Sequence, residues 1–201
     1  MHPEESRGPC PCKLPFLLPD EVAVRNDSAD CWVSFLGGVY DLTELCRTWR
    51  GHESIKPILA HAGKDISHWF DHRRKDIRHY VHPITGPLDR CPWWLDERFR
   101  IGNLTRNARP CRIVNVLTGL QAVITVCEED TVERIRERFL GFNAHGMSYT
   151  WKFQGKEIDP RCTLTENGIP DERDRFSACG LPDDVYIPSL MCYYNDDLTE
   201  M

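Results

Sequence analysis

The sequence lacks any long uninterrupted apolar segment. A helix that crosses a bilayer needs about 20 consecutive apolar residues, and no run in this 201-residue chain comes near that length. The first residues include Glu4, Glu5 and several prolines, and their only apolar stretch, from Leu14 to Leu18, is too short for a secretory signal. The sequence therefore predicts a protein that stays in the cytoplasm and has no membrane anchor.

An excess of positive charge is also missing. Lys and Arg number 25 against 31 Asp and Glu, which gives a net charge of -6. A surface of this sign does not attract the phosphates of a nucleic acid over the whole chain, so we expect no nucleic-acid partner. The hydrophobic share of 41% and charged share of 28% are typical of a globular protein with one or two domains.

Paired metal-binding cysteines are absent as well. The chain has ten cysteines but no Cys-x-x-Cys pair, and in a reducing compartment scattered cysteines are usually free thiols that pack as small apolar side chains. Cys10 and Cys12 stand close together in a proline-rich segment, where a metal site would need distant ligands. The sequence also shows no nucleophile–base set and no phosphate-binding loop, so we expect no enzymatic activity.

The first half of the chain predicts a hairpin followed by short helices. Residues 31–36 and 39–42 are rich in β-forming side chains and are separated by Gly37 and Gly38, which favours two antiparallel strands. Thr43 is placed to cap a helix that begins at Glu44. Residues 55–62 form a second helical stretch that ends at Gly63, and Asp65 could cap another through Phe70.

The second half has a different pattern. Residues 112–116 and 122–126 predict an antiparallel hairpin around a turn at residues 117–119. Thr131 starts a helix with apolar residues at helical spacing, residues 148–153 form a strand, and residues 154–156 form a turn. A short helical turn at residues 163–169 and a last strand at residues 185–194 complete the order β, β, α, β, short helix, β.

That order, from Cys111 to Tyr194, resembles the β-grasp of ubiquitin. The resemblance is carried by four short motifs: Val116-Leu117-Thr118-Gly119, Asp130-Thr131-Val132, Phe153-Gln154-Gly155-Lys156 and Thr163-Leu164. An insertion between Asp171 and Pro182 departs from the pattern, and the acidic end of the chain lacks the Gly-Gly pair that conjugation needs. The resemblance implies a docking domain; a module that only adds bulk and stability is the alternative.

The first half resembles the cytochrome b5-like haem-binding family. The matching segments are Cys31-Trp32-Val33, Val39-Tyr40-Asp41-Leu42-Thr43 and Ala62-Gly63-Lys64-Asp65, with Phe70 five residues further on. The predicted fold class is α+β. We expect an N-terminal arm at residues 1–18, a cytochrome b5-like domain at 19–88, a linker at 89–107 and a ubiquitin-like domain at 108–201.

The resemblance implies a b-type haem, held non-covalently, but its usual ligands are altered. The family's first ligand lies in a His-Pro-Gly-Gly stretch, and that histidine position falls at Trp49, which cannot bind iron. His52 is the nearest substitute. Counting from Asp65 places the second ligand at Lys75, whereas counting from closer relatives places it near His79, the best imidazole candidate, and Tyr80, a phenolate candidate.

Six of the eight histidines lie between residues 52 and 82. If residues 66–79 formed one helix, His68, His72 and His79 would lie near one face, at a spacing that can bind zinc or iron. Arg73, Arg74 and the lysine after them favour a solvated polar face instead.

The resemblance also implies a cellular role. Two-domain relatives with this arrangement imply a protein of the cytoskeleton in the ciliary axoneme, associated with radial-spoke proteins, where redox-dependent haem binding would influence beating of the cilium or flagellum. Two alternatives stay open: a purely structural ciliary assembly protein with a degenerate haem pocket, and an adaptor that uses the ubiquitin-like surface.

Overall fold

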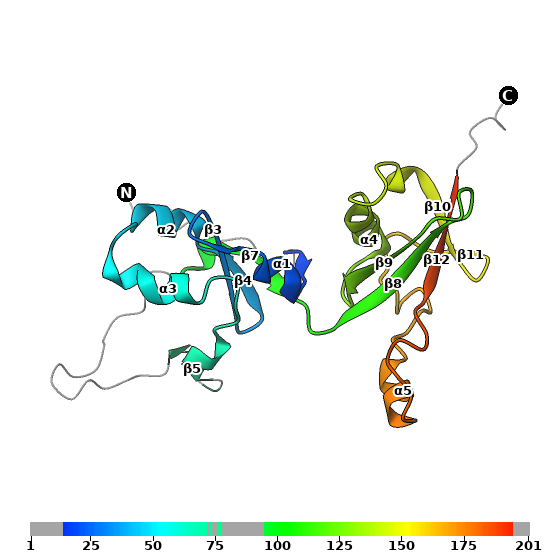
Figure 1. Cartoon of the computed structure of the whole chain (residues 1–201). Coiled ribbons are helices and arrows are strands. Elements are labelled where there is room, and N and C mark those ends of the chain that lie inside the picture. Colours follow the sequence, from blue (N-terminus) through cyan, green and yellow to red (C-terminus); the bar gives the residue numbers. More distant parts are fainter. Residues whose placement is uncertain (1–13, 72, 74–75, 78–94, 195–201) are drawn as a thin grey trace, which may run out of the picture. The chain divides into compact units, whose positions relative to one another are not determined.

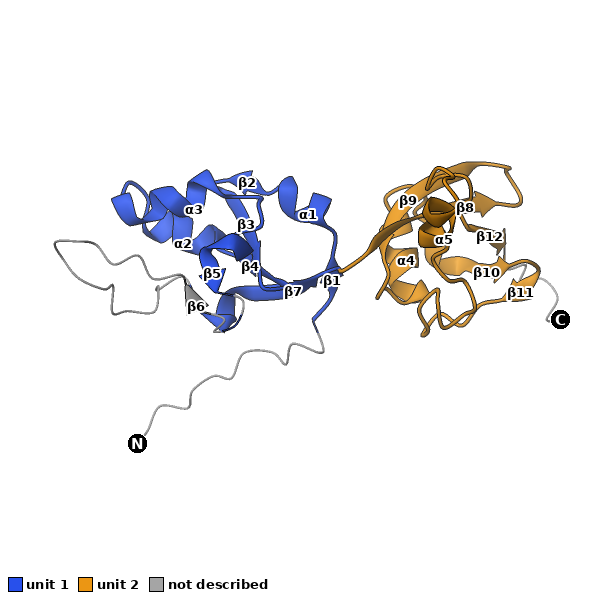
Figure 2. Cartoon of the chain, turned by 90° about the horizontal axis from the view of Figure 1, so that it is seen from below, with its two compact units in different colours: residues 1–105 blue, residues 106–201 orange. Residues whose placement is uncertain are grey.

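The computed structural model describes residues 14–71, 73, 76–77 and 95–194 (Figure 1). The chain divides into two compact units, residues 1–105 and 106–201, which are coloured separately in Figure 2. Each unit has its own sheet and its own apolar core.

The first unit contains a five-stranded sheet in the order β1-β7-β4-β3-β2. The strands are β1 (Phe16–Leu17), β2 (Asn26–Asp27), β3 (Asp30–Phe35), β4 (Gly38–Asp41) and β7 (Arg100–Leu104). The β3–β4 hairpin is antiparallel, as predicted, with Val33 opposite Tyr40. β7 pairs antiparallel with β4 and parallel with β1.

Short helices connect the strands of this unit. They are α1 (Pro19–Ala23), α2 (Thr43–Thr48), α3 (Lys56–Ala60) and the 3-10 turns η2 (Glu53–Ile55), η3 (Ser67–Trp69) and η4 (Glu97–Phe99). A two-stranded ribbon follows η3 and consists of β5 (Phe70–Asp71) and β6 (Asp76–Ile77). Figure 1 shows α2 and α3 on the same side of the sheet, and their side chains Cys46 and Ile58 are buried in one core with Val33, Phe35 and Phe70 of the strands.

Two predictions for the first unit were wrong, and one helix that was considered is absent. Thr43 does not cap α2: its hydroxyl oxygen accepts a 3.0 Å hydrogen bond from the Cys31 amide, and Asp41 accepts one of 2.9 Å from the Thr43 amide instead. The helix considered for residues 66–79 is not formed, because η3 is followed directly by the β5–β6 ribbon. The predicted linker, residues 89–107, includes β7, which is an inner strand of the first sheet.

The predicted strands and the helix after Thr131 occur in the predicted order in the second unit. Residues 163–169 form hydrogen-bonded turns rather than a short helix, and one short strand and two short helices were not predicted. The sheet of this unit has the order β11-β10-β12-β8-β9 and comprises β8 (Ala108–Asn115), β9 (Gln121–Cys127), β10 (Tyr149–Phe153), β11 (Lys156–Glu157) and β12 (Ser189–Tyr194). β8 and β12 are parallel neighbours in the middle, and their other neighbours are antiparallel. The last strand is shorter than predicted, since it begins only after Pro188.

One amphipathic helix supplies most of the helical core contacts in this unit. It is α4 (Val132–Phe139), and the Thr131 hydroxyl caps it by accepting a 3.3 Å bond from the Arg134 amide, as predicted. Val132, Ile135 and Phe139 are buried against the sheet, where Phe139 meets Trp151 edge to face. The other helices are η5 (Gly146–Ser148) and α5 (Arg173–Ala178), which lies in the predicted insertion.

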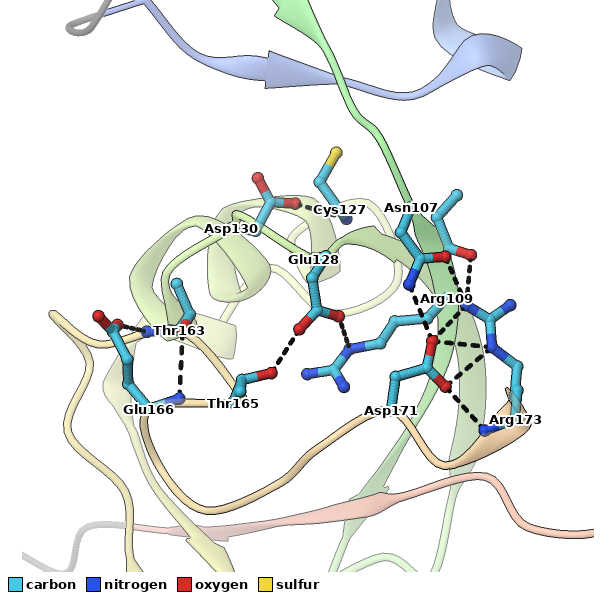
Figure 3. A network of polar contacts seen from close by, with 11 residues as sticks. Asn107, Arg109, Cys127, Glu128, Asp130, Thr163, Thr165, Glu166, Asp171 and Arg173 are labelled. Atoms are coloured by element: carbon cyan, nitrogen blue, oxygen red, sulfur yellow. Dashed lines mark hydrogen bonds and ion pairs between the residues drawn. The ribbon is translucent and has the colours of Figure 1, made fainter. Parts of the chain in front are cut away.

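A polar network connects the segment before α5 to the start of β8 (Figure 3). Asp171 accepts hydrogen bonds from the Arg173 guanidinium and from the Asn107 side-chain amide, and Arg173 also donates to the Asn107 side chain and the Ala108 carbonyl. Hydrogen bonds from Arg173 hold the pKa of Asp171 well below its usual range. The network therefore holds its charges in their ionised forms at neutral pH.

A second charged pair drawn in Figure 3 has one buried partner. Arg109 is 2% exposed, and its Nε atom lies 3.0 Å from Oε2 of Glu128. The other oxygen of Glu128 accepts a short hydrogen bond from the Thr165 hydroxyl, while both terminal nitrogens of Arg109 have no hydrogen-bond partner among the described residues. Glu128 therefore provides the compensating charge for the buried guanidinium.

Candidate functional site

Three stacked aromatic rings form the centre of the first unit. The Phe35 ring lies between those of Tyr40 and Phe70, with centroid separations of 4.0 and 4.8 Å and interplanar angles of 9° and 11°. All three side chains are buried. The hairpin brings Phe35 and Tyr40 together, and β5 adds Phe70. Half-buried leucines from α2, α3 and the segment before η4 pack against the same core; they are Leu45, Leu59 and Leu95.

A groove of about 260 Å³ lies beside the aromatic stack. It is lined by Phe35, Leu36, Tyr40, Phe70, Leu95, Asp96, Glu97 and Arg100. On its polar side the Tyr40 hydroxyl donates a 3.2 Å hydrogen bond to Glu97, which also lies 3.5 Å from Arg100. Burial, together with the negative charge of Glu97, raises the pKa of Tyr40 to about 12. Tyr40 is therefore a neutral hydrogen-bond donor at physiological pH.

The two candidate residues that follow α2 lie at the surface. Trp49 ends the helix and is 38% exposed. The His52 ring lies edge to face with the Trp49 indole, with 5.3 Å between centroids. His52 Nδ1 contacts the Ser54 hydroxyl at 2.6 Å and the Ser54 amide at 3.2 Å. The structure therefore brings these two residues together, but it uses the His52 ring to cap η2.

The other two candidate ligands, His79 and Tyr80, lie outside the described residues, as do His72 and Lys75. His68 is described and exposed on η3. Because η3 ends at Trp69, the helical spacing that would have aligned His68 with His72 and His79 does not exist.

His61 is an imidazole that was not considered as a ligand in the sequence. Its Nδ1 atom lies 2.9 Å from the Pro57 carbonyl, which fixes Nδ1 as the protonated nitrogen and leaves Nε2 as the acceptor. The ring packs edge to face on Trp69, at 4.8 Å, and lies 6.1 Å from the His68 ring. In the sequence, the i, i+4 spacing of Pro57 and His61 near the end of a predicted helix was the pattern that could have indicated this hydrogen bond.

The described residues meet only part of what a haem requires. The aromatic stack and Leu95 give the groove apolar lining of the kind that the faces of a porphyrin need. Trp49, the residue that motif spacing predicts at the first ligand position, carries an indole, which cannot bind iron. In the described ranges, no group of three or more His, Cys, Asp or Glu residues could hold a metal ion.

Comparisons with known proteins show the family to which this domain is related. Residues 19–105 match the model of the Cytochrome b5-like Heme/Steroid binding domain. The chain is 38% identical to human Cytochrome b5 domain-containing protein 1 over 92% of each chain. It is 39% identical to the Xenopus laevis protein of that name over 95% of this chain and 99% of the relative. The chain belongs to the cytochrome b5 domain-containing protein 1 family.

Membership of the cytochrome b5 domain-containing protein 1 family explains the position of β7. The matched domain extends to residue 105 and so includes β7, which the sequence had placed in a linker. Cytochrome b558 of Ectothiorhodospira vacuolata is among the structural neighbours, with 24% identity, a TM-score of 0.31, 46% of this chain and 100% of that chain covered. Within the described ranges, no helix has the length and apolar character to span a membrane.

Proposed function

We propose that the first unit binds haem with an altered set of axial ligands and acts without being an enzyme. The observation that carries the proposal is the stack of Tyr40, Phe35 and Phe70, which gives a rigid aromatic wall next to a groove. Bound haem would supply a one-electron couple that responds to the redox state of its surroundings.

The residues that would hold the haem iron in this proposal come from the segment after β6. Trp49 takes the place of the first family ligand without binding iron. His79 or Tyr80 would supply the second, because counting from the closer relatives places that ligand near these two residues. His52 is the weaker candidate, since its ring is exposed and Nδ1 is engaged by Ser54.

Haem ligation can be tested by adding haemin to the whole chain and to three ligand variants. We expect a saturable Soret band that is altered by His79→Ala or by Tyr80→Phe and unaffected by His52→Ala. His145→Ala, in the second unit, is the matched histidine control. An unchanged spectrum in both the His79 and the Tyr80 variants would contradict the ligand assignment.

We further propose that the second unit is a ubiquitin-like β-grasp domain that docks onto a protein partner. The supporting observation is its strand order, with an N-terminal hairpin, one helix across the sheet and the last strand in the middle. The hairpin exposes Val123 on β9, and the turn between its strands exposes Val116, Leu117 and Leu120. Affinity capture with the whole chain, compared with a Leu117→Asp and Leu120→Asp variant, tests whether this surface binds a partner.

Association with radial-spoke proteins of the ciliary axoneme stays a prediction that rests on the sequence resemblance. It is tested by expressing the tagged whole chain in ciliated cells and fractionating their axonemes. Retention in salt-washed axonemes, together with radial-spoke proteins, is the expected result. A chain found only in the cell body would contradict this role, and capture of ubiquitin receptors alone would favour the adaptor.

A further inference from the structure

Two buried cysteines lie in the same core cluster of the first unit. Cys31 lies on β3 and is 0% exposed; Cys46 lies on α2 and is 3% exposed. Both belong to the core cluster that includes Val33 and Leu42. Both are free cysteines in this structure.

The backbone fixes α2 directly over Cys31. The Cys31 amide donates a 3.0 Å hydrogen bond to the Thr43 hydroxyl, and its carbonyl accepts one of 2.8 Å from the Leu42 amide. One turn further on, the Cys46 amide donates to the Leu42 carbonyl at 2.9 Å. Residues three or four apart share a helix face, so Cys46 lies on the face that Leu42 and Thr43 hold against β3.

Both side chains are buried in this one cluster, on two elements that the backbone bonds hold together. Burial raises the pKa of both thiols, and the Cys46 thiol adds to this effect at Cys31. Both thiols are therefore protonated at neutral pH while α2 is closed.

We propose that Cys31 and Cys46 are a site of reversible oxidation that closes to a disulfide in the presence of hydrogen peroxide. The Cys46 sulfur attacks one peroxide oxygen, the O–O bond breaks, and Cys46 becomes a sulfenic acid with release of water. The Cys31 sulfur then attacks the Cys46 sulfur, the S–O bond breaks, and a second water leaves. In total, the two thiols lose two electrons and two protons, and the peroxide is reduced to two waters.

The disulfide would connect the sheet to the helix that leads to Trp49 and His52. It would close a short loop between β3 and α2, which restricts the unfolded chain and stabilises the folded unit. Because both thiols are buried, oxidation requires a local opening of α2, which has only six residues. Oxidation is therefore slow in the closed unit. The inference is independent of the haem proposal.

The oxidation can be measured on the whole chain, purified without added haemin. The reduced protein is treated with hydrogen peroxide, its remaining thiols are alkylated, and its peptides are mapped by mass spectrometry. We expect a linked pair of peptides containing Cys31 and Cys46, two hydrogens lighter than the separate peptides, which dithiothreitol releases. Cys31→Ala and Cys46→Ala abolish the link, whereas Cys111→Ala, which removes a buried thiol of the second unit, preserves it.

Thermal unfolding provides a second readout. Oxidation should raise the melting temperature of the first unit by ~5 °C or more in the wild type, and it should have no such effect in Cys46→Ala. Peptide mapping of the wild-type protein tests the link between Cys31 and Cys46 by itself, so the test holds even if a variant fails to fold. The proposal is overturned if Cys31 and Cys46 stay open to alkylation after unfolding, or if they are found only as oxidised single thiols or linked to other cysteines.

Discussion

The Trp49 indole and the His52 imidazole lie edge to face, with 5.3 Å between their centroids, at the end of α2. Motif spacing predicts Trp49 at the position of the family's first haem ligand. His52 lies three residues later, and its Nδ1 contacts Ser54. The His52 ring thus caps the next turn, and in our proposal the haem ligands come from residues further along the chain.

Restoring a histidine at residue 49 should therefore change the coordination of bound haem. In Trp49→His we expect a second imidazole to reach the iron, with a sharper, shifted Soret band and the visible bands of a low-spin haem. Absorption spectra of the haemin-loaded chain make the comparison. Arg47→His, which adds an imidazole at an exposed position of α2, is the control. Identical spectra for the two variants would mean that residue 49 does not face the iron.

Asp65 should be important for the stability of the first unit although it is exposed. Its carboxylate accepts hydrogen bonds from the hydroxyls of Ser34 and Ser67, each at 3.0 Å, and from the Ser67 amide at 2.9 Å. Asp65→Ala leaves the buried Ser34 hydroxyl without this acceptor, and we expect a loss of about 2 kcal/mol. Urea unfolding measures it. Asp27→Ala, which removes a carboxylate bonded to the adjacent Ser28, should cost far less.

Removing Glu128 should destabilise the second unit more than removing Arg109, its ion-pair partner. Glu128→Ala leaves the Arg109 guanidinium buried without a compensating charge, which costs about 3–5 kcal/mol. Arg109→Met leaves a carboxylate that still contacts Thr165 and is 27% exposed, so the loss is smaller. Combining Arg109→Met with Glu128→Ala should recover part of the stability lost in Glu128→Ala. A larger loss for Arg109→Met than for Glu128→Ala would contradict this account.

Acid should weaken the second unit through Asp171. Hydrogen bonds from Arg173 lower the pKa of Asp171 in the folded state. The stabilisation is therefore complete above the unfolded pKa of about 4 and is lost as the pH falls from there toward the lower folded value. Asp171→Asn should flatten this part of the stability profile, measured by urea unfolding between neutral and acidic pH. Asp174→Asn is the control, and an unchanged profile in Asp171→Asn would refute the assignment.

The elements that local patterns define were predicted well. The β3–β4 hairpin, the turn at Gly119, the Thr131 cap and the buried face of α4 all follow from residues close together in the sequence. In each case the turn glycine, the cap or the apolar spacing is sufficient to specify the element.

The elements that distant contacts define were missed. β7 has a glycine in its middle, and a Cβ atom at Gly102 would lie 2.6 Å from the Leu17 side chain of β1. Gly102 thus permits a pairing between segments that are far apart in the sequence. The Thr43 hydroxyl likewise accepts a hydrogen bond from the distant Cys31 amide instead of capping α2. For the candidate site, motif spacing located Trp49 and His52, but the use of the His52 ring by Ser54 could only be seen in the structure.

A haemin titration of the purified whole chain tests the central claim most directly. Because the aromatic wall of Phe35, Tyr40 and Phe70 is formed although Trp49 replaces a ligand, we predict a saturable one-to-one Soret shift whose bands change between oxidising and reducing conditions. Phe35→Asp, which places a charge in the middle of the stack, should abolish it. A wild-type spectrum no different from that of haemin mixed with an unrelated protein would contradict the claim and leave the first unit as a scaffold.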